Sequence, residues 1–134
     1  MKPSGLDPVA IHTVAAIRAA CAALPHSRET FPFGAATLVF KVGGKMYALT
    51  DIHAESLSLS LKVRLERGEA LRAEHAAITP GYHLNKRHWI TLQLDSVPGD
   101  LACELLAESH ALVLAGLTRA QRAELAASAL ESET

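Results

Sequence analysis

Hydrophobic and polar residues alternate strictly over residues 56–62, where Leu57, Leu59 and Leu61 are separated by serines. Alternation with a period of two is typical of a β-strand that has one buried face. We therefore predict a strand over residues 56–62 in which the three leucines point into the core. The opposite face of this strand carries Ser58, Ser60 and Lys62.

The same alternation returns over residues 88–94 and predicts a second strand. Its inward positions are Ile90, Leu92 and Leu94, with His88 on their side. Its outward positions are Trp89, Thr91 and Gln93. Because Trp89 is a large apolar side chain on a polar face, we expect other parts of the chain to cover it partly. The edge of its ring is expected to stay accessible beside Arg87.

Two further apolar runs, residues 38–42 and 45–49, flank Gly43-Gly44. Two glycines between two strands favour a tight hairpin turn, in which both turn residues can adopt positive φ. Opposite pairing across such a turn places one set of side chains on the core face: Leu38, Phe40, Val42, Tyr47 and Leu49. Lys45 lies at the hairpin tip on that same side, and Lys41 points the other way.

Apolar residues at steps of three and four predict four helices, over residues 7–23, 65–75, 98–114 and 118–129. The last one begins at a capping box, because Thr118 is followed three residues later by Gln121. The element order predicts a two-layer α+β fold with an antiparallel sheet packed against helices. The fold begins with an N-terminal helix and ends with two C-terminal helices. A chain of 134 residues is expected to form a single domain over residues 1–134.

The net charge of −1 hides an uneven distribution. Residues 41–90 carry eight basic and five acidic side chains, whereas residues 91–134 carry two basic and seven acidic ones. This distribution excludes a uniformly basic nucleic-acid-binding protein but leaves room for a locally basic face. No long apolar run is present, so we expect a cytoplasmic protein that does not bind a membrane. Cys21 and Cys103 are expected to be reduced, buried thiols.

Residues 80–89 concentrate functional side chains more densely than any other segment. Lys86 and Arg87 are suited to phosphate contact, and Tyr82 or Trp89 to stacking on a base or sugar. His83 and His88 are candidate stacking or anchoring residues beside them. The alternative is structural, with Trp89 covering the sheet and His83 and Asn85 holding the loop by hydrogen bonds.

Three lysines outside this segment are further candidates for nucleic-acid binding. Lys41 and Lys45 lie on the hairpin, where they either form a basic wing or protect a sheet edge from aggregation. Lys62 extends the serine face of its strand, which either contacts phosphate or is simply solvated.

The sequence lacks the patterns that support catalysis or metal binding. His53-Ala54-Glu55 matches half of a zinc deaminase motif, but the required Pro-Cys-x-x-Cys is absent, and neither cysteine has a ligand at short spacing. Nucleophile elbows and glycine-rich phosphate loops are also absent. We therefore expect no enzymatic activity, no cofactor and no metal.

Three segments together resemble the MmcQ/YjbR family of small bacterial proteins. They are Phe31-Pro32-Phe33-Gly34, the hairpin of residues 39–49, and Pro80-Gly81-Tyr82-His83-Leu84-Asn85-Lys86-Arg87-His88-Trp89. The resemblance covers residues 30–118. It implies an α+β fold similar to secretion chaperones, a proposed double-wing DNA-binding role, and no catalytic residue. Where the family often has an acidic residue followed by proline, this chain has Arg64 and Leu65, so the start of that helix loses its usual cap.

Two functions follow as hypotheses. The first is non-enzymatic binding of double-stranded DNA through Lys41, Lys45, Lys62, Lys86 and Arg87. The alternative is a protein- or peptide-binding module that uses the surface of Tyr82, Arg87 and Trp89 as anchors. A small-molecule pocket over the sheet is a third interpretation.

Overall fold

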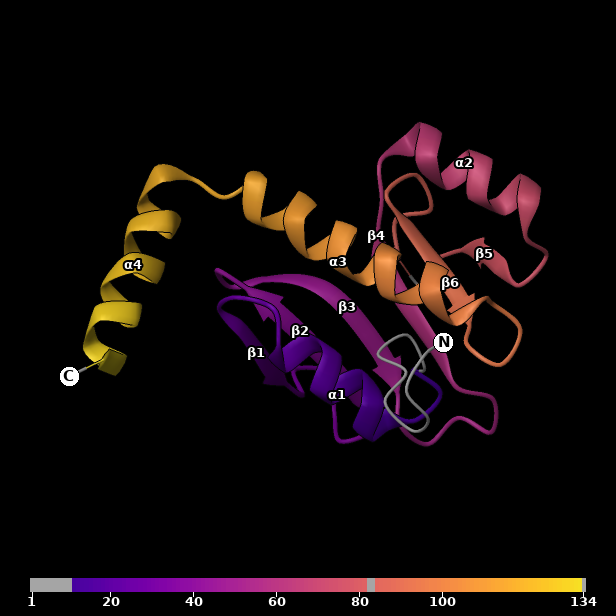
Figure 1. Cartoon of the computed structure of the whole chain (residues 1–134), viewed down its shortest axis with the longest axis horizontal. Helices are drawn as coiled ribbons and strands as arrows, with labels where there is room; N and C mark the ends of the chain where they lie inside the picture. The colour runs from indigo at the N-terminus through magenta and orange to yellow at the C-terminus, as the bar shows by residue number, and fades with distance from the viewer. Residues whose placement is uncertain (1–10, 82–83, 134) are drawn as a thin grey trace, which may run out of the picture.

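The computed structural model describes residues 11–81 and 84–133 (Figure 1). Six strands form one sheet in the order β1-β2-β3-β4-β6-β5, and every neighbouring pair is antiparallel. The elements, in chain order, are α1 (Val14–Ala22), β1 (Ser27–Thr30), β2 (Thr37–Val42), β3 (Lys45–Asp51), β4 (Ser58–Lys62), α2 (Leu65–Glu74), β5 (Ile78–Pro80), β6 (Trp89–Gln93), α3 (Gly99–Ala115) and α4 (Arg119–Glu133).

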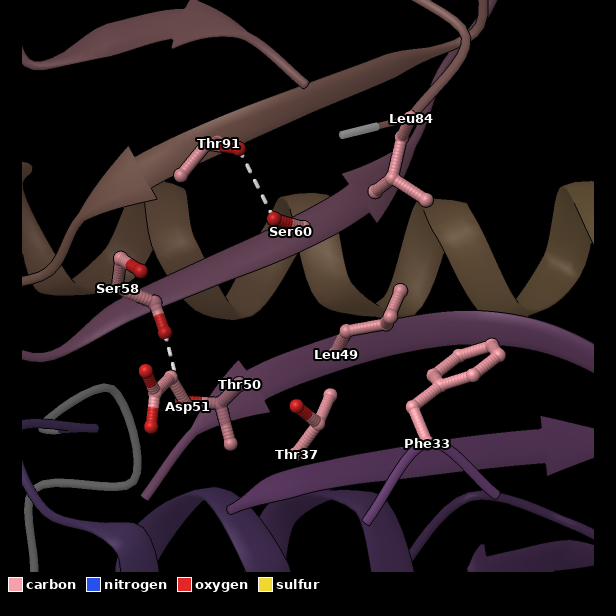
Figure 2. A pocket seen from close by; sticks show the side chains of 9 residues that line it. All are labelled: Phe33, Thr37, Leu49, Thr50, Asp51, Ser58, Ser60, Leu84 and Thr91. Atoms are coloured by element: carbon pink, nitrogen blue, oxygen red, sulfur yellow. Dashed lines mark hydrogen bonds between the residues drawn. The ribbon is translucent and has the colours of Figure 1, made fainter. Parts of the chain in front are cut away.

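Three helices pack on one face of the sheet, which gives the predicted two-layer α+β arrangement. The core joins Ile17 of α1, Leu71 of α2 and Leu105 of α3 to inward residues of the strands, such as Phe40 and Leu59. Each of these five side chains is at most 2% exposed. The opposite face of the sheet, here called the outer face, carries no helix in the described part of the chain (Figures 1 and 2).

Period-two alternation correctly identified the core positions of β4 and β6. Leu59 and Leu61 are fully buried. Their β6 counterparts, Ile90 and Leu92, are at most 1% exposed. Leu57 precedes β4 and is only half-buried against the core. Thr91 was predicted to be more exposed than the leucines but is only 6% exposed, and it lies between Ser60 and Thr79 of the neighbouring strands.

The hairpin contains a β-bulge that the sequence pattern does not reveal. Val42 pairs with Lys45 and Lys41 with Met46, but Phe40 then pairs with Ala48, so Tyr47 is the extra residue. A bulge inserts one residue and reverses the facing of everything beyond it. Tyr47 is buried in the core as predicted. Placing Leu49 on the core face was wrong, because Leu49 pairs with Val39 and Ser60 on the outer face.

Two strands and several element ends differ from the prediction. The edge strands β1 and β5 were not predicted, because one is short and polar and the other has three residues ending in Pro80. Helix α1 begins after its cap, Thr13, whose hydroxyl accepts the Ala16 N–H, rather than at residue 7. The part of that prediction before residue 11 lies outside the described residues.

The helix ends show one confirmed cap and one missing cap. Thr118 and Gln121 form the predicted capping box, with the Thr118 N–H donating to Gln121 Oε1 at 2.8 Å and the Gln121 N–H donating to Thr118 Oγ1 at 3.1 Å. Arg64 occupies the cap position of α2 and makes no side-chain capping bond. Glu66 in the first turn is the acidic group that favours this helix end.

Helix α3 completes the sheet where two central strands separate. In the described pairing, only Ala48 and Leu49 of β3 face β4, and the two strands diverge toward the hairpin (Figure 1). There, Ser109 Oγ donates to the Tyr47 carbonyl at 2.6 Å and accepts the Lys62 N–H at 2.9 Å. A helix hydroxyl therefore replaces the missing ladder bond, and it separates the hairpin from the ends of β4 and β6.

Candidate functional site

The hairpin of β2 and β3 presents two of the predicted lysines. Gly43 and Gly44 have φ values of +60° and +79°, which allow the tight turn. Lys45 is exposed at the tip, and Lys41 is half-buried on the outer face beside Arg28 of β1. We call Lys41 and Lys45 the hairpin group. The tip is not free on all sides, because a Cβ on Gly43 would lie 2.5 Å from Leu117 Cδ1.

A second group of cations gathers where β4 ends and β6 begins. Lys62 pairs with Trp89, and the Val63 N–H donates to the His88 carbonyl at 2.8 Å. This pairing brings the chain around Arg64 next to Lys86 and Arg87. Arg64, Lys86 and Arg87 are exposed, and Lys62 is half-buried. We call the four cations Lys62, Arg64, Lys86 and Arg87 the loop group.

The loop between β5 and β6 is held by Asn85. Its side-chain Oδ1 accepts the Arg87 N–H at 2.9 Å, and its carbonyl accepts the His88 N–H at 3.1 Å. The predicted structural role of Asn85 is therefore present, and it coexists with outward-facing Lys86 and Arg87. Tyr82 and His83 lie outside the described residues.

Trp89 is a buried residue, not an exposed anchor. Only 8% of it is accessible. The Gly81 N–H donates to the Trp89 carbonyl at 2.9 Å, and a Cβ on Gly81 would lie 2.6 Å from Trp89 Cβ. The loop backbone thus packs directly against this residue, and the expectation of an accessible ring edge was wrong. His88 was predicted to face the core, but β6 begins after it and His88 is exposed.

The predicted cations fall into two groups, one on the hairpin and one where β4 ends and β6 begins, because β3 and β4 diverge between them. The hairpin group and the loop group both lie at the hairpin end of the sheet, as the strand register requires. Ser109 of α3 stands between the strands that carry them. The sequence predicted five of these cations, but it did not predict Arg64 as a member or the division into two groups.

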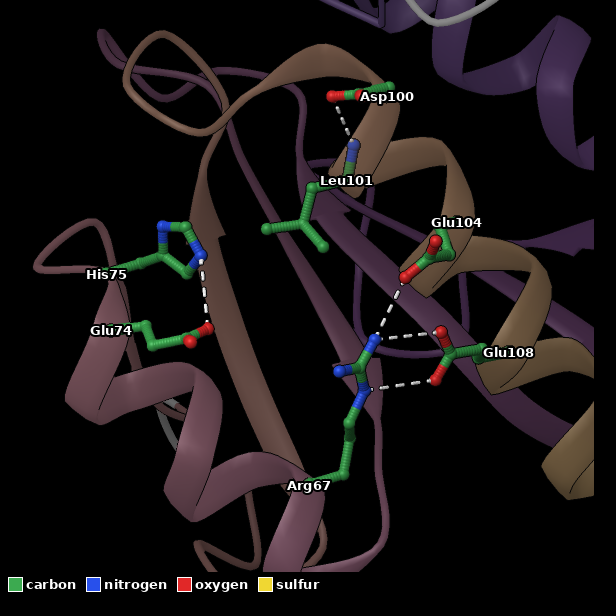
Figure 3. A network of polar contacts seen from close by, with 7 residues as sticks. All are labelled: Arg67, Glu74, His75, Asp100, Leu101, Glu104 and Glu108. Atoms are coloured by element: carbon green, nitrogen blue, oxygen red, sulfur yellow. Dashed lines mark hydrogen bonds and ion pairs between the residues drawn. The ribbon is translucent and has the colours of Figure 1, made fainter.

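Arg18 and Arg67 are ion-paired in the described part of the chain, and the six cations of the hairpin and loop groups are not. Arg67 contacts Glu104 at 2.9 Å and Glu108 at 3.1 Å, which joins α2 to α3 (Figure 3). Arg18 contacts Glu29 at 2.8 Å. These carboxylates raise the pKa of both guanidinium groups above the usual value. Among the described residues, no carboxylate lies within ion-pair distance of any cation of the hairpin or loop group.

The outer face contains a pocket that sequence reasoning named only in general terms. Its volume is about 460 Å³, and it crosses β2, β3, β4 and β6 (Figure 2). Leu49 and the hydrogen-bonded pair of Ser60 and Thr91, whose hydroxyls are 2.9 Å apart, form part of its lining. Phe33 lines it from the β1–β2 loop and is 64% exposed. Two phenylalanines flanking Pro32 in a loop were the signal that could have located it.

A buried polar cluster lies under β1, and its groups are satisfied. The Tyr47 and Ser27 hydroxyls are hydrogen-bonded, and His110 Nε2 is 2.8 Å from the Pro25 carbonyl oxygen. Burial raises the pKa of the neighbouring Cys21 thiol to about 12. The thiol is therefore protonated at neutral pH and is not a ready nucleophile. Cys103 is also a free thiol and is half-buried, not buried as predicted.

Within the described ranges, no group of three or more histidine, cysteine or acidic side chains is arranged to hold a metal ion. No single helix in those ranges is long and apolar enough to cross a membrane, and only α3 and α4 together, bent by 110°, reach the necessary length and composition.

This chain is similar to two curated proteins of Escherichia coli. It is 32% identical over 97 residues to the "Uncharacterized protein YbdF" of Escherichia coli O157:H7, covering 72% of this chain and 80% of that protein. It is 30% identical over 83 residues to the "Uncharacterized protein YjbR" of Escherichia coli K12, covering 62% of this chain and 70% of that protein.

Two crystal structures are also similar. Protein DR2400 of Deinococcus radiodurans, a DUF419 domain, has a TM-score of 0.80 and 55% identity over 89% of this chain and 90% of that chain. A protein from Pseudomonas syringae has a TM-score of 0.57 and 28% identity over 64% of this chain and 86% of that chain. The YjbR family model matches residues 22–112, so the chain belongs to the YjbR family.

Proposed function

We propose that this protein is a non-enzymatic binding protein that contacts double-stranded DNA through the hairpin group and the loop group. The observation that carries the proposal is the gathering of these six cations at one end of the sheet, where none has a carboxylate partner within the described structure. Exposed, unpaired lysines and arginines are the side chains that neutralise DNA phosphates.

The arrangement supports phosphate contact more than base reading. The cations lie on a hairpin tip and a loop, and Trp89 is too buried to stack on a base. Because β3 and β4 diverge between the two groups, each would contact its own stretch of backbone. The net charge of −1 gives little long-range attraction, so we expect modest affinity that falls steeply with salt.

Paired substitutions test each group separately. Fluorescence anisotropy of a labelled duplex would compare the wild type with Lys86→Ala/Arg87→Ala and with Lys41→Ala/Lys45→Ala. Each pair should weaken binding to all duplex sequences alike. Arg18→Ala/Arg72→Ala is the charge-matched control, since Arg18 is paired with Glu29 and Arg72 donates to the Gly68 carbonyl. Equal affinity of all four proteins would remove both groups from DNA binding.

A protein- or peptide-binding module is the second candidate, and a different observation favours it. Phe31 and Phe33 are 49% and 64% exposed, as large apolar side chains at interfaces often are. They take the place of Trp89 as the exposed apolar anchors of this candidate function. Suppression of insulin B-chain aggregation would test this function. It should disappear in Phe31→Ser/Phe33→Ser and persist in Lys86→Ala/Arg87→Ala; activity in both variants would contradict it.

A further inference from the structure

The outer-face pocket separates its apolar and polar sides. In Figure 2, Phe33 and Leu84 lie toward one end and Asp51 and Ser58 toward the other, with Leu49 between them. A volume of about 460 Å³ is within the range of small-molecule sites. An apolar wall facing a few polar groups is also the composition such sites share.

Charge restricts what this pocket accepts. Among the described residues that line it, Asp51 is the one with an ionisable side chain. Its Oδ1 accepts the His53 N–H at 2.9 Å, and no cation of the described chain is paired with it. A carboxylate repels an anion and attracts an ammonium group. The pocket therefore disfavours phosphate, in contrast to the hairpin and loop groups.

Hydroxyl groups add directional contacts beside Asp51. Thr50 Oγ1 donates to the Ser58 carbonyl at 2.7 Å, which fixes the strand at this point. Within the described chain, the hydroxyls of Ser58 and Thr37 have no hydrogen-bond partner, although both residues line the pocket. They can accept from an ammonium group held at Asp51.

The apolar end is too exposed to be explained by packing alone. Phe33 is 64% exposed, and Leu49 and Leu84 are half-buried around the same hollow. An aromatic or branched aliphatic body would cover these three side chains and remove their apolar surface from water. We infer that the outer-face pocket binds a small amphipathic amine, with its apolar body against Phe33 and Leu84 and its ammonium group at Asp51.

Three matched probes test this inference. The amine 2-phenylethylamine, the neutral 2-phenylethanol and the anionic 3-phenylpropanoate share one apolar body and differ in the head group. Titrations followed by ¹⁵N–¹H spectra of the whole protein should show saturable shifts at Leu49, Ser60 and Thr91. The amine should bind most tightly, in the millimolar range, and the propanoate least.

Four variants assign the contacts. Asp51→Asn keeps the acceptor for the His53 N–H and should weaken the amine about threefold to fivefold while leaving the alcohol unchanged. Phe33→Ala should lower the affinity for all three probes by about tenfold. Ser58→Leu should fill the pocket and abolish the shifts. Glu69→Gln, an exposed carboxylate on α2, should change nothing.

The substitutions of Asp51 and Phe33, which are exposed, keep the test decisive even if Ser58→Leu does not fold. Equal affinity of the three probes, tightest binding of the propanoate, or shifts confined to other residues would overturn the inference. So would an unchanged preference for the amine in Asp51→Asn. Asp51→Asn and Phe33→Ala should leave DNA binding unchanged, because Asp51 and Phe33 belong to neither cation group. The pocket inference and the DNA proposal can therefore fail separately.

Discussion

At the residue scale, burial separates the side chains that hold the fold from those available to a partner. Leu59 is fully buried in the centre of the sheet, and its neighbour Ser58 is half-buried on the outer face. Lys86 and Arg87 are exposed next to Trp89, which is buried. Adjacent residues of one strand or loop therefore serve different purposes.

Replacing Leu59 should show how much the core contributes. Leu59→Ala should lower the free energy of unfolding by about 2–5 kcal/mol, because it removes buried methyl groups and leaves a cavity. Ser58→Ala is the control on the other face of β4 and should change stability by less than about 0.5 kcal/mol. Urea unfolding measures both, and equal effects would mean that the facing of β4 is misassigned.

Trp89 should behave as a core residue in solution. It is the single tryptophan of the chain and is 8% exposed. We expect a blue-shifted emission spectrum that iodide and acrylamide quench poorly, because the ring is removed from water. A red-shifted, easily quenched spectrum would restore Trp89 as a stacking or anchoring residue.

At the element scale, two side chains contact the hairpin at defined points. Ser109 bridges β3 and β4 at the point where they separate, and Leu117, between α3 and α4, lies against Gly43 of the hairpin. These contacts hold the two cation groups in place.

Removing the Ser109 hydroxyl should lower the stability of the protein more than removing an exposed hydroxyl. Ser109→Ala leaves the buried Tyr47 carbonyl and the Lys62 N–H without this partner, which should cost about 1–3 kcal/mol of unfolding free energy. Ser96→Ala, an exposed serine, is the matched control and should be close to neutral. If thermal and urea unfolding give the two variants the same stability, water takes over the hydrogen bonds to the Tyr47 carbonyl and the Lys62 N–H.

Substituting the two hairpin glycines in turn distinguishes the effect of backbone strain from the effect of packing. Both have positive φ, so Gly44→Ala should cost about 1–2 kcal/mol. Gly43→Ala should cost about 1–3 kcal/mol more, because its Cβ would lie 2.5 Å from Leu117 Cδ1, whereas nothing lies within 4 Å of a Cβ on Gly44. Equal stability losses would show that the hairpin moves freely relative to Leu117.

The sequence predicted a side chain's facing correctly where neighbouring residues in the same strand determine it, and failed where distant segments determine it. Leu59, Leu61, Ile90 and Leu92 were placed correctly, because alternation along one strand fixes their facing. Leu49 was misplaced, because the bulge at Tyr47 depends on how α3 and β4 meet β3.

The candidate site followed the same rule. The cations of residues 41, 45, 62, 86 and 87 could be named from the sequence, but their division by Ser109 could not. Strand β1 was missed because all four of its residues are polar and follow a turn in which His26 has a φ of +61°. The burial of Trp89 depends on Gly81, eight residues away, and no local pattern encodes it.

At the scale of the whole molecule, the helices cover one face of the sheet and leave cations at one end and a pocket on the other face. Acidic side chains are concentrated in residues 91–134, where Glu104 and Glu108 neutralise Arg67. The hairpin and loop groups, which gather at one end of the sheet without carboxylate partners in the described chain, are consequently the part best suited to a polyanion, and DNA binding is the central claim.

The salt dependence of duplex DNA binding tests that claim most directly. If the six cations each neutralise one phosphate, the logarithm of the association constant should fall with the logarithm of salt concentration with a slope of about −5. Lys86→Ala/Arg87→Ala should make the slope less negative by about two, and Arg18→Ala/Arg72→Ala should leave it unchanged. No detectable binding at low salt, or the same slope in all three proteins, would contradict the account.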